Sequence, residues 1–287
     1  MISQSELQRT GTILREAGME LYNTDFKGYH QLFLERRLNH IALRLGITKG
    51  STLVDLLVNQ PGIIEALKKE IHIGYTTFFR DPGFFLRAIE LIRRKLDQQK
   101  IVHIWHAGCS KGYEVYSLVM LLHEQGLVRN CRIYATDINT AHLAQAEKGI
   151  VPIADLHAGI RPYLTAGGTH HIGQHFTATK NEAIFRHDLL RKIKFGHHDL
   201  GKDKPFQQFD FIFCRNVFIY YQPFYQKKLL QCISNSLMNE GYLGLSPTEN
   251  IEENCAEFSL TCFDNHLNIY KKSEMCKTLL NKDKISI

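Results

Sequence analysis

The sequence lacks the features that would place this chain in a membrane or among disulfide-bonded secreted proteins. No apolar stretch is long enough to span a bilayer, and no basic segment followed by an apolar run opens the chain. The seven cysteines are odd in number and form no C-x-x-C pair, so a disulfide framework is not expected. These absences predict a cytoplasmic protein that does not insert into membranes.

A strong excess of one charge is also missing. The 287 residues carry a formal net charge of +6, and the sequence contains no recognition-helix, zinc-finger or RNA-binding signature. With 44% hydrophobic and 22% charged residues, the composition is that of a folded globular protein. We therefore expect one large or two modest domains and no nucleic-acid partner.

The spacing of apolar residues divides the chain into two parts. Residues 5–95 show helical spacing, with breaks at Pro61 and Gly62 and again from Asp81 to Gly83. A polar segment follows at 97–100. We predict a small N-terminal all-helical domain over residues 1–97 and a second domain over residues 98–287.

From residue 101 onward, strand-like and helix-like segments alternate, which is typical of a doubly wound α/β fold with a parallel sheet. The predicted strands are 101–107, 131–136, 193–197, 209–214 and 241–245, with helices at 114–124, 140–148 and 223–238 and two closing strands within 255–272. Residues 150–192 do not fit this alternation, because Gly159, Pro162, Gly167 and Gly168 interrupt it. We expect an inserted subdomain there.

One glycine turn indicates a nucleoside-binding site. Gly108 and Gly112 follow an apolar run, and Asp137 ends the next one. Glycine lets the backbone approach a ligand closely, and a carboxylate after the second strand can accept hydrogen bonds from both ribose hydroxyls. NAD and S-adenosylmethionine both fit such a half-site, but the absence of G-x-G-x-x-G and the long separation of Gly108 from Asp137 favour the methyl donor.

Three further motifs occur in order along the chain. They are Thr-x-Phe-Phe-Arg-Asp-Pro at 76–82, Phe-Cys-Arg-Asn-Val-x-Ile-Tyr at 213–220, and Glu-Asn at 249–250 after a Gly-Tyr-Leu strand at 241–243. In this combination the chain resembles the CheR family of chemotaxis receptor methyltransferases, from about Asp25 to Tyr270. The resemblance implies a Rossmann-like methyltransferase sheet with a small inserted β subdomain. It also implies an S-adenosylmethionine-dependent protein-glutamate O-methyltransferase that forms methyl esters on chemoreceptors.

The resemblance further implies which residues meet the donor, whose product is S-adenosylhomocysteine. The donor-binding residues would be Thr76, Arg80, Gly108, Glu114, Asp137, Asp199, Leu200, Arg215 and Asn216. Asp137 is expected at the ribose and Asp199 and Leu200 beside the adenine, while Arg80 and Tyr220 would be the catalytic pair near the transferring methyl group. Taken alone, Asp137 could cap the following helix, Arg80 could tie to Asp81, and Tyr220 could anchor the next helix.

The implied partner is the acidic helical cytoplasmic domain of a chemoreceptor, or a similar protein, and the family default is a monomer. Arg36, Arg37, His40 and Arg44 form a basic helix face that either docks such a partner or is a solvated surface. No metal site is expected. His171 and His175 have i, i+4 spacing, but no Cys or acidic set completes a site, so the histidines of the insert are predicted at the surface.

Two other functions remain open on the residues themselves. A related methyltransferase acting on another protein or a small carboxylate would share the sheet and the donor site. A donor-binding signalling module would bind without turnover. Family members usually have Asn where this chain has Gly74, and the turn at 112–117 keeps the second acid, Glu114, but lacks the first acid and the proline. Because Arg80 and Tyr220 are both present, we expect an active enzyme.

Overall fold

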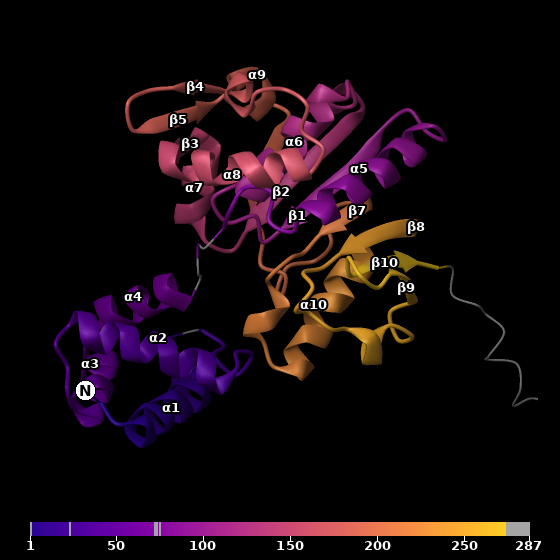
Figure 1. Ribbon diagram of the computed structural model, residues 1–287. Helices are drawn as coiled ribbons and strands as arrows, with labels where there is room; N and C mark the ends of the chain where they lie inside the picture. Colours follow the sequence, from indigo (N-terminus) through magenta and orange to yellow (C-terminus); the bar gives the residue numbers. More distant parts are fainter. Residues whose placement is uncertain (1, 23, 72–73, 75, 274–287) are drawn as a thin grey trace, which may run out of the picture.

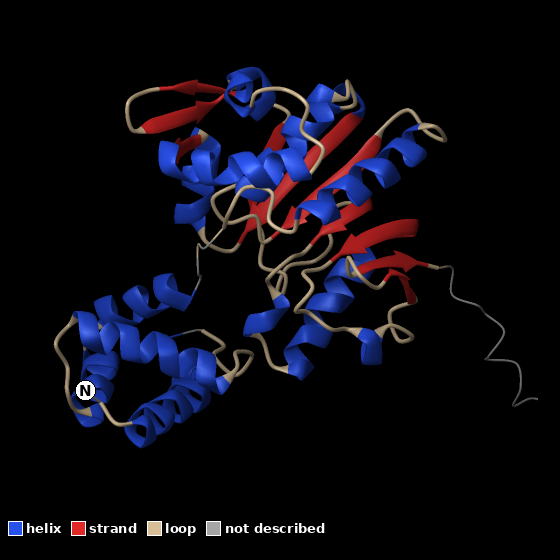
Figure 2. Cartoon of the chain, viewed as in Figure 1, coloured by secondary structure: helices blue, strands red, loops and turns tan. Residues whose placement is uncertain are grey.

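The computed structural model describes residues 2–22, 24–71, 74 and 76–273. Within them, a bundle of helices lies beside a larger unit in which helices pack on a mixed sheet (Figures 1 and 2). No helix among the described residues is long and apolar enough to cross a bilayer.

Four helices form the smaller unit. They are α1 (Gln4–Tyr22), α2 (Gln31–Arg44), α3 (Gly50–Asn59) and α4 (Pro61–Ile71). Each helix buries one apolar stripe, so that Leu14, Leu34, Leu53 and Leu67 share a core. The predicted helical character of this region is confirmed, and Pro61 occupies the start of α4, where proline costs no hydrogen bond.

The larger unit is built on a seven-stranded sheet of order β6-β2-β1-β7-β8-β10-β9. Its strands are β1 (Val102–Ala107), β2 (Cys131–Asp137), β6 (Ile193–His197), β7 (Phe209–Phe213), β8 (Leu237–Gly244), β9 (Leu260–Asp264) and β10 (Ile269–Lys272). The first five strands in this order run parallel, and β10 runs antiparallel to both β8 and β9. The α/β fold predicted from the alternation is confirmed.

The helices of this unit also lie close to their predicted places. They are α6 (Tyr113–Glu124), α7 (Thr140–Lys148) and α10 (Pro223–Ser236), with short 3-10 helices η1 (Val128–Asn130), η2 (Ile172–His175), η3 (Phe218–Tyr220) and η4 (Glu252–Asn254) in the connections. The largest difference is in β8, which begins at Leu237 rather than at 241. Helix α10 therefore ends at Ser236 and not at 238 as predicted.

Helix α5 (Pro82–Leu96) packs with the sheet and not with the first four helices. Its buried residues, among them Phe84, Phe85 and Ile92, belong to the same core as Val102 and Ile104 of β1. Residues 2–71 form a separate core. The sequence placed a domain boundary after residue 97. On this packing we propose instead that the α/β unit begins before α5.

The segment 150–192 forms the small antiparallel subdomain that was expected. Its sheet has the order β3-β5-β4, with β3 (Ile150–Pro152), β4 (Phe176–Ala178) and β5 (Glu182–Phe185), and it carries α8 (Ile153–Thr165) and α9 (His187–Leu190). Gly159 and Pro162, two of the residues that break the alternation in the sequence, lie inside α8. A Cβ at Gly159 would lie 2.8 Å from Cβ of Phe78, and glycine therefore lets α8 pack closely on the loop before α5.

The two units meet through a short backbone pairing. His30 N donates to Tyr220 O (2.9 Å), and Gln222 N donates to Gly28 O (2.7 Å). Between these bonds the ring of Tyr29 stacks on Tyr221, with 4.8 Å between ring centroids. The helical unit is thus fixed to the loop that follows β7.

Candidate active site

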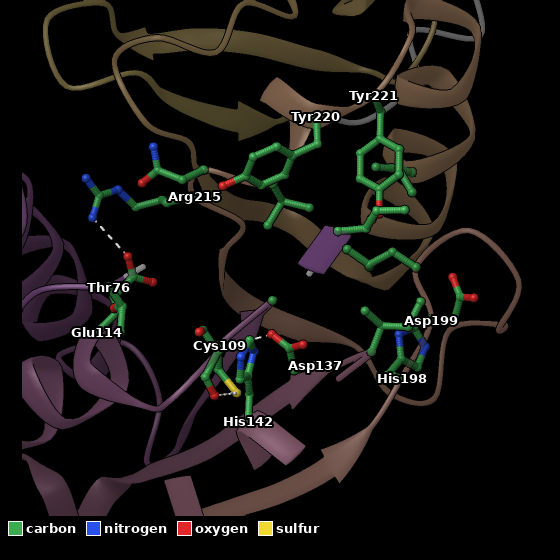
Figure 3. A pocket seen from close by; sticks show the side chains of 18 of the residues that line it. Thr76, Cys109, Glu114, Asp137, His142, His198, Asp199, Arg215, Tyr220 and Tyr221 are labelled. Carbon is green, nitrogen blue, oxygen red and sulfur yellow. Dashed lines mark hydrogen bonds and ion pairs between the residues drawn. The ribbon is translucent and has the colours of Figure 1, made fainter. Parts of the chain in front are cut away.

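A cavity lies at the carboxyl ends of β1, β2, β6 and β7, where the order of the parallel strands changes direction. All ten residues predicted for the donor site and for catalysis line it. They are Thr76, Arg80, Gly108, Glu114, Asp137, Asp199, Leu200, Arg215, Asn216 and Tyr220. Residues far apart in the sequence therefore gather around one space, and several of them are labelled in Figure 3.

The glycine turn brings backbone to the edge of this cavity. Gly108 has a φ of +82°, and a Cβ there would lie 2.6 Å from Cγ2 of Val217. Only glycine fits both the backbone conformation and the contact. The N–H groups of Gly108 and Cys109 donate to Thr136 O (2.8 and 2.9 Å), which ties the turn to the end of β2.

Asp137 orders this turn with its carboxylate. Oδ2 accepts a hydrogen bond from Ser110 N (2.7 Å) and Oδ1 accepts one from Asn139 N (2.8 Å). The helix that follows is capped by Asn139, whose side chain accepts from the N–H groups of Ala141 and His142. Asp137 is therefore not the helix cap, and a carboxylate has acceptor sites left after two hydrogen bonds.

Glu114, in the first turn of α6, is held between two basic groups. Its Oε1 lies 3.0 Å from Nδ1 of His106, and its Oε2 accepts from Nη1 of Arg215 (2.9 Å). Burial would raise the pKa of Glu114, but the hydrogen bonds and charges of His106 and Arg215 outweigh it and hold the pKa below its usual value. The carboxylate is ionised at neutral pH.

The guanidinium of Arg215 donates its hydrogen bonds to other protein groups rather than into the cavity. Its side chain is fully buried, Nη1 also donates to Arg80 O (3.2 Å), and Nη2 donates to Asp81. The guanidinium carbon lies 4.4 Å from the ring centroid of Phe84. Because Asp81 pairs with Arg215, the alternative in which Arg80 ties to Asp81 has no support. Arg215 lines the cavity and holds its wall together.

A buried carboxylate supports the loop that carries Asn216 and Tyr220. Glu249 accepts hydrogen bonds from the backbone N–H groups of Asn216 (2.9 Å), Val217 (2.7 Å), Phe218 (2.7 Å) and Ser246 (2.8 Å). Asn216 itself has a φ of +60°, an unfavourable conformation that these bonds stabilise. The Glu-Asn motif at 249–250 therefore has a structural reason: its acid shapes the loop.

Arg80 and Tyr220 reach the cavity from different elements. Within the described part of the chain, the guanidinium of Arg80 makes no hydrogen bond or ion pair. Burial raises the pKa of Tyr220 although the charge of Arg80 acts to lower it, so the phenol is protonated at neutral pH. The ring of Tyr220 packs on Phe33 of α2 (4.9 Å between centroids), whereas Tyr221 stacks on Tyr225 of α10 (5.1 Å). Tyr221, not Tyr220, has the aromatic contact with α10.

The far end of the cavity is lined by residues that follow β6 and β7. Tyr221, His198 and Asp199 lie there, away from Thr76 and Glu114 (Figure 3). Nδ1 of His198 is buried and has no hydrogen-bond partner within the described residues. An unsatisfied ring nitrogen among apolar side chains fits a flat, nitrogen-bearing base, and the acceptor sites of Asp137 fit a ribose. The residues present therefore fit the adenosyl group of the methyl donor.

Several lining residues were not predicted. They include Tyr29, Cys109, Ser110, Ile138, His142 and His198. Cys109 and Ser110 lie in the glycine turn, and His198 immediately precedes Asp199, so proximity in sequence could have identified them. Tyr29 comes from the helical unit, and only the packing of the two units brings it to the cavity.

The histidines of the insert do not all lie at the surface. His171 is exposed, but His175 is buried, and its Nε2 lies 2.8 Å from Oε1 of Glu124. Glu124 also accepts from Thr169 N (2.9 Å) and from the hydroxyl of Tyr163. The surface prediction was wrong for His175, because a buried carboxylate compensates its polarity. Among the described residues, no group of three or more metal-ligating side chains occurs.

Known proteins resemble this chain over most of its length. "Putative methyltransferase Cher3" of Pseudomonas putida is 32% identical over 84% of this chain and 88% of its own length. The chemotaxis protein methyltransferase of Borreliella burgdorferi is 28% identical over 78% of this chain and 82% of its own length. The one from Listeria monocytogenes is 27% identical over 92% of this chain and 96% of its own length.

The similarity to solved structures is weaker. A TehB-like SAM-dependent methyltransferase from Corynebacterium glutamicum is 13% identical, with a TM-score of 0.38, over 73% of this chain and 94% of its own. That level supports no conclusion. By contrast, residues 75–266 match the family model described as "CheR methyltransferase, SAM binding domain", and this match spans the glycine turn, Asp137 and the loop after β7. The chain belongs to the CheR family of chemotaxis methyltransferases, which use S-adenosylmethionine as the methyl donor.

Proposed function

We propose that this enzyme transfers the methyl group of S-adenosylmethionine to glutamate side chains of a chemoreceptor and forms methyl esters. The observation that carries the proposal is that Arg80 and Tyr220 line the same cavity as Asp137 and Glu114. A cationic and a phenolic group beside a nucleoside site suit an anionic acceptor. The Borreliella and Listeria relatives are named chemotaxis protein methyltransferases, which supports the receptor as substrate.

A glutamate acceptor suits a site with few catalytic groups. The reference pKa of a glutamate carboxyl is about 4.3, so it is ionised near neutral pH and needs no general base. The donor, when bound, supplies a methyl group on a positively charged sulfur, and this sulfur is a good leaving group. The protein must then align the acceptor and exclude water, and orientation of this kind contributes on the order of 7–11 kcal/mol.

Arg80 and Tyr220 would divide this task. The guanidinium of Arg80, free of ion pairs within the described residues, would hold the incoming carboxylate while leaving one oxygen free to attack. The protonated hydroxyl of Tyr220 would donate a hydrogen bond that orients the carboxylate. Arg215 and Glu249 would position this pair, since their hydrogen bonds fix the two loops that carry Arg80 and Tyr220.

The proposed partner is an acidic helical receptor domain that docks on α2 of a monomeric, cytoplasmic enzyme. Of the four basic residues on α2, His40 and Arg44 contact Glu70 of α4 (2.9 and 2.8 Å), which offsets part of their charge. Arg36 is exposed, and Arg37 lies over the ring of Phe33, 5.5 Å from its centroid. Phe33 also contacts Tyr220, so this face leads from the helix surface toward the cavity.

The test is methyl transfer from labelled donor to cytoplasmic receptor fragments, followed by mild base. We expect label on the receptor that base releases, as for an ester. Base-stable label, or label only on another protein or a small carboxylate, would contradict the proposed acceptor. Donor binding without transfer to any acceptor would support the signalling module instead.

A further inference from the structure

His142 is a cavity residue to which neither the sequence nor the proposed chemistry assigns a role. It lies in the first turn of α7, is half-buried, and lines the cavity beside Asp137 and Cys109 (Figure 3). Its backbone N–H donates to Asn139 (3.2 Å). Within the residues that the structure describes, its imidazole makes no hydrogen bond or ion pair, so a ring nitrogen is available to a ligand.

The position of this ring depends on Gly74. A Cβ at residue 74 would lie 2.6 Å from Nε2 and 2.8 Å from Cε1 of His142, and 3.1 Å from Cε of Lys111. Carbon atoms do not approach an imidazole this closely, so any side chain at residue 74 would displace the ring. Gly74 and His142 are therefore a matched pair, in which the missing side chain makes room for the imidazole.

The chemistry of His142 complements that of Asp137. Burial lowers the pKa of His142, and the positive charge of Lys111 acts in the same direction, while the charge of Asp137 opposes them. The imidazole is therefore neutral at pH 7 and has one donor and one acceptor nitrogen. Asp137 can only accept hydrogen bonds. A ribose hydroxyl both donates and accepts, so it can donate to Asp137 and accept from the imidazole.

We propose that His142 hydrogen-bonds a ribose hydroxyl of the methyl donor alongside Asp137, and that Gly74 holds the space this requires. The inference depends on the donor site described above and not on the identity of the methyl acceptor. His142 is then a donor-binding residue of this chain, supplied by α7 opposite a loop position that carries no side chain.

The test is calorimetric binding of S-adenosylhomocysteine to the full chain and to five variants. His142→Ala should weaken binding about tenfold, and Gly74→Ala should weaken it similarly because the ring is displaced. Adding Gly74→Ala to His142→Ala should cost nothing further. His142→Gln keeps a donor and an acceptor and should recover part of the loss. His157→Ala, at an exposed position on α8, is the matched control and should bind like the unmodified protein.

A second ligand locates the contact. 5′-Methylthioadenosine keeps the ribose and lacks the amino acid, so His142→Ala should weaken its binding by the same factor. A loss seen with S-adenosylhomocysteine alone would place His142 at the amino-acid end and overturn the ribose contact.

The remaining outcomes separate this inference from the donor site itself. Failure of the unmodified protein to bind S-adenosylhomocysteine would overturn both. Normal binding by the unmodified protein together with binding by His142→Ala within twofold of it would overturn the inference alone. Equal losses from Gly74→Ala in the presence and absence of His142 would show that the two residues are not a pair.

Discussion

Nη1 of Arg215 donates to Oε2 of Glu114 across 2.9 Å, while Nη2 of the same guanidinium donates to Asp81. One buried cation thereby joins three elements: the end of β7, the first turn of α6 and the loop before α5. The side chain of Arg215 is fully buried, whereas that of Asp81 is 38% exposed, so the pair with Glu114 is the better shielded of the two.

We therefore expect Arg215→Met to lower both stability and donor affinity. The substitution leaves Glu114 without one of its two basic partners, and removing one member of a buried pair costs on the order of 3 kcal/mol. The free energy of unfolding in urea and the affinity for S-adenosylhomocysteine are the two measurements. Arg215→Lys keeps the charge but cannot reach both acids. Its stability and donor affinity should lie between those of the unmodified protein and Arg215→Met. A fully stable Arg215→Met protein would show that the network carries little energy.

Asp137→Ala should weaken binding of S-adenosylhomocysteine by tenfold or more. The expected loss is about 1.5–3 kcal/mol, the usual range for hydrogen bonds to a charged group. The change also frees the N–H groups of Ser110 and Asn139, so Asp137→Asn, which keeps one acceptor oxygen, is the milder comparison. Calorimetry measures both. If both variants bind the ligand as well as the unmodified protein does, the ribose does not lie at Asp137.

Arg80 and Tyr220 should separate catalysis from donor binding. Arg80→Ala removes the proposed carboxylate partner, and Tyr220→Phe removes one hydroxyl while keeping the ring against Phe33. Both should lower kcat for receptor methylation at least tenfold, with a smaller change in the affinity for S-adenosylhomocysteine. Single-turnover methylation and calorimetry on the same preparations give the two numbers. A variant that loses only donor affinity would belong to the binding site rather than to catalysis.

The Glu124–His175 pair predicts acid sensitivity outside the active site. Burial raises the pKa of Glu124, but hydrogen bonds from Tyr163, Thr169 and His175 outweigh it and lower the pKa from 4.5 to about 2. The unfolded chain therefore binds this proton first, and the stability contributed by Glu124 is present above pH 4.5 and lost as the pH falls toward 2. Burial lowers the pKa of His175, which acts in the same direction below about pH 6.5.

Unfolding in urea between pH 7 and pH 2.5 tests this prediction, because the predicted loss lies below pH 4.5. Glu124→Gln should be less stable than the unmodified protein at pH 7, and the difference should shrink as the pH falls. A difference that stays constant with pH would mean that the ionisation of Glu124 does not couple to folding.

The strands were predictable because the sheet is covered by helices. Every residue of β7 is buried, which leaves a short apolar run in the sequence with a polar loop after it. The residues at the ends of these strands could be assigned to one edge for the same reason. Helix α5 was harder, because an amphipathic pattern shows that one face is buried but not which core covers it.

The bonding inside the site was not predictable. Arg215 was expected at the donor, yet its partners Asp81 and Glu114 lie in other segments, and only the folded chain brings the three together. His175 was expected at the surface because polar residues usually lie there, and the buried acid that compensates it comes from α6. The fit of Gly74 to His142 is likewise a contact between segments far apart in the chain, with no trace in local sequence.

The stacking of Tyr29 on Tyr221 between the two units has a practical meaning for truncated forms of this enzyme. The stretch that matches the family model starts at residue 75 and so omits Tyr29, which lines the cavity. A fragment cut there would also bare the ring of Tyr221, which now stacks against Tyr29. A fragment with the complete cavity wall must therefore reach back at least to the turn before α2.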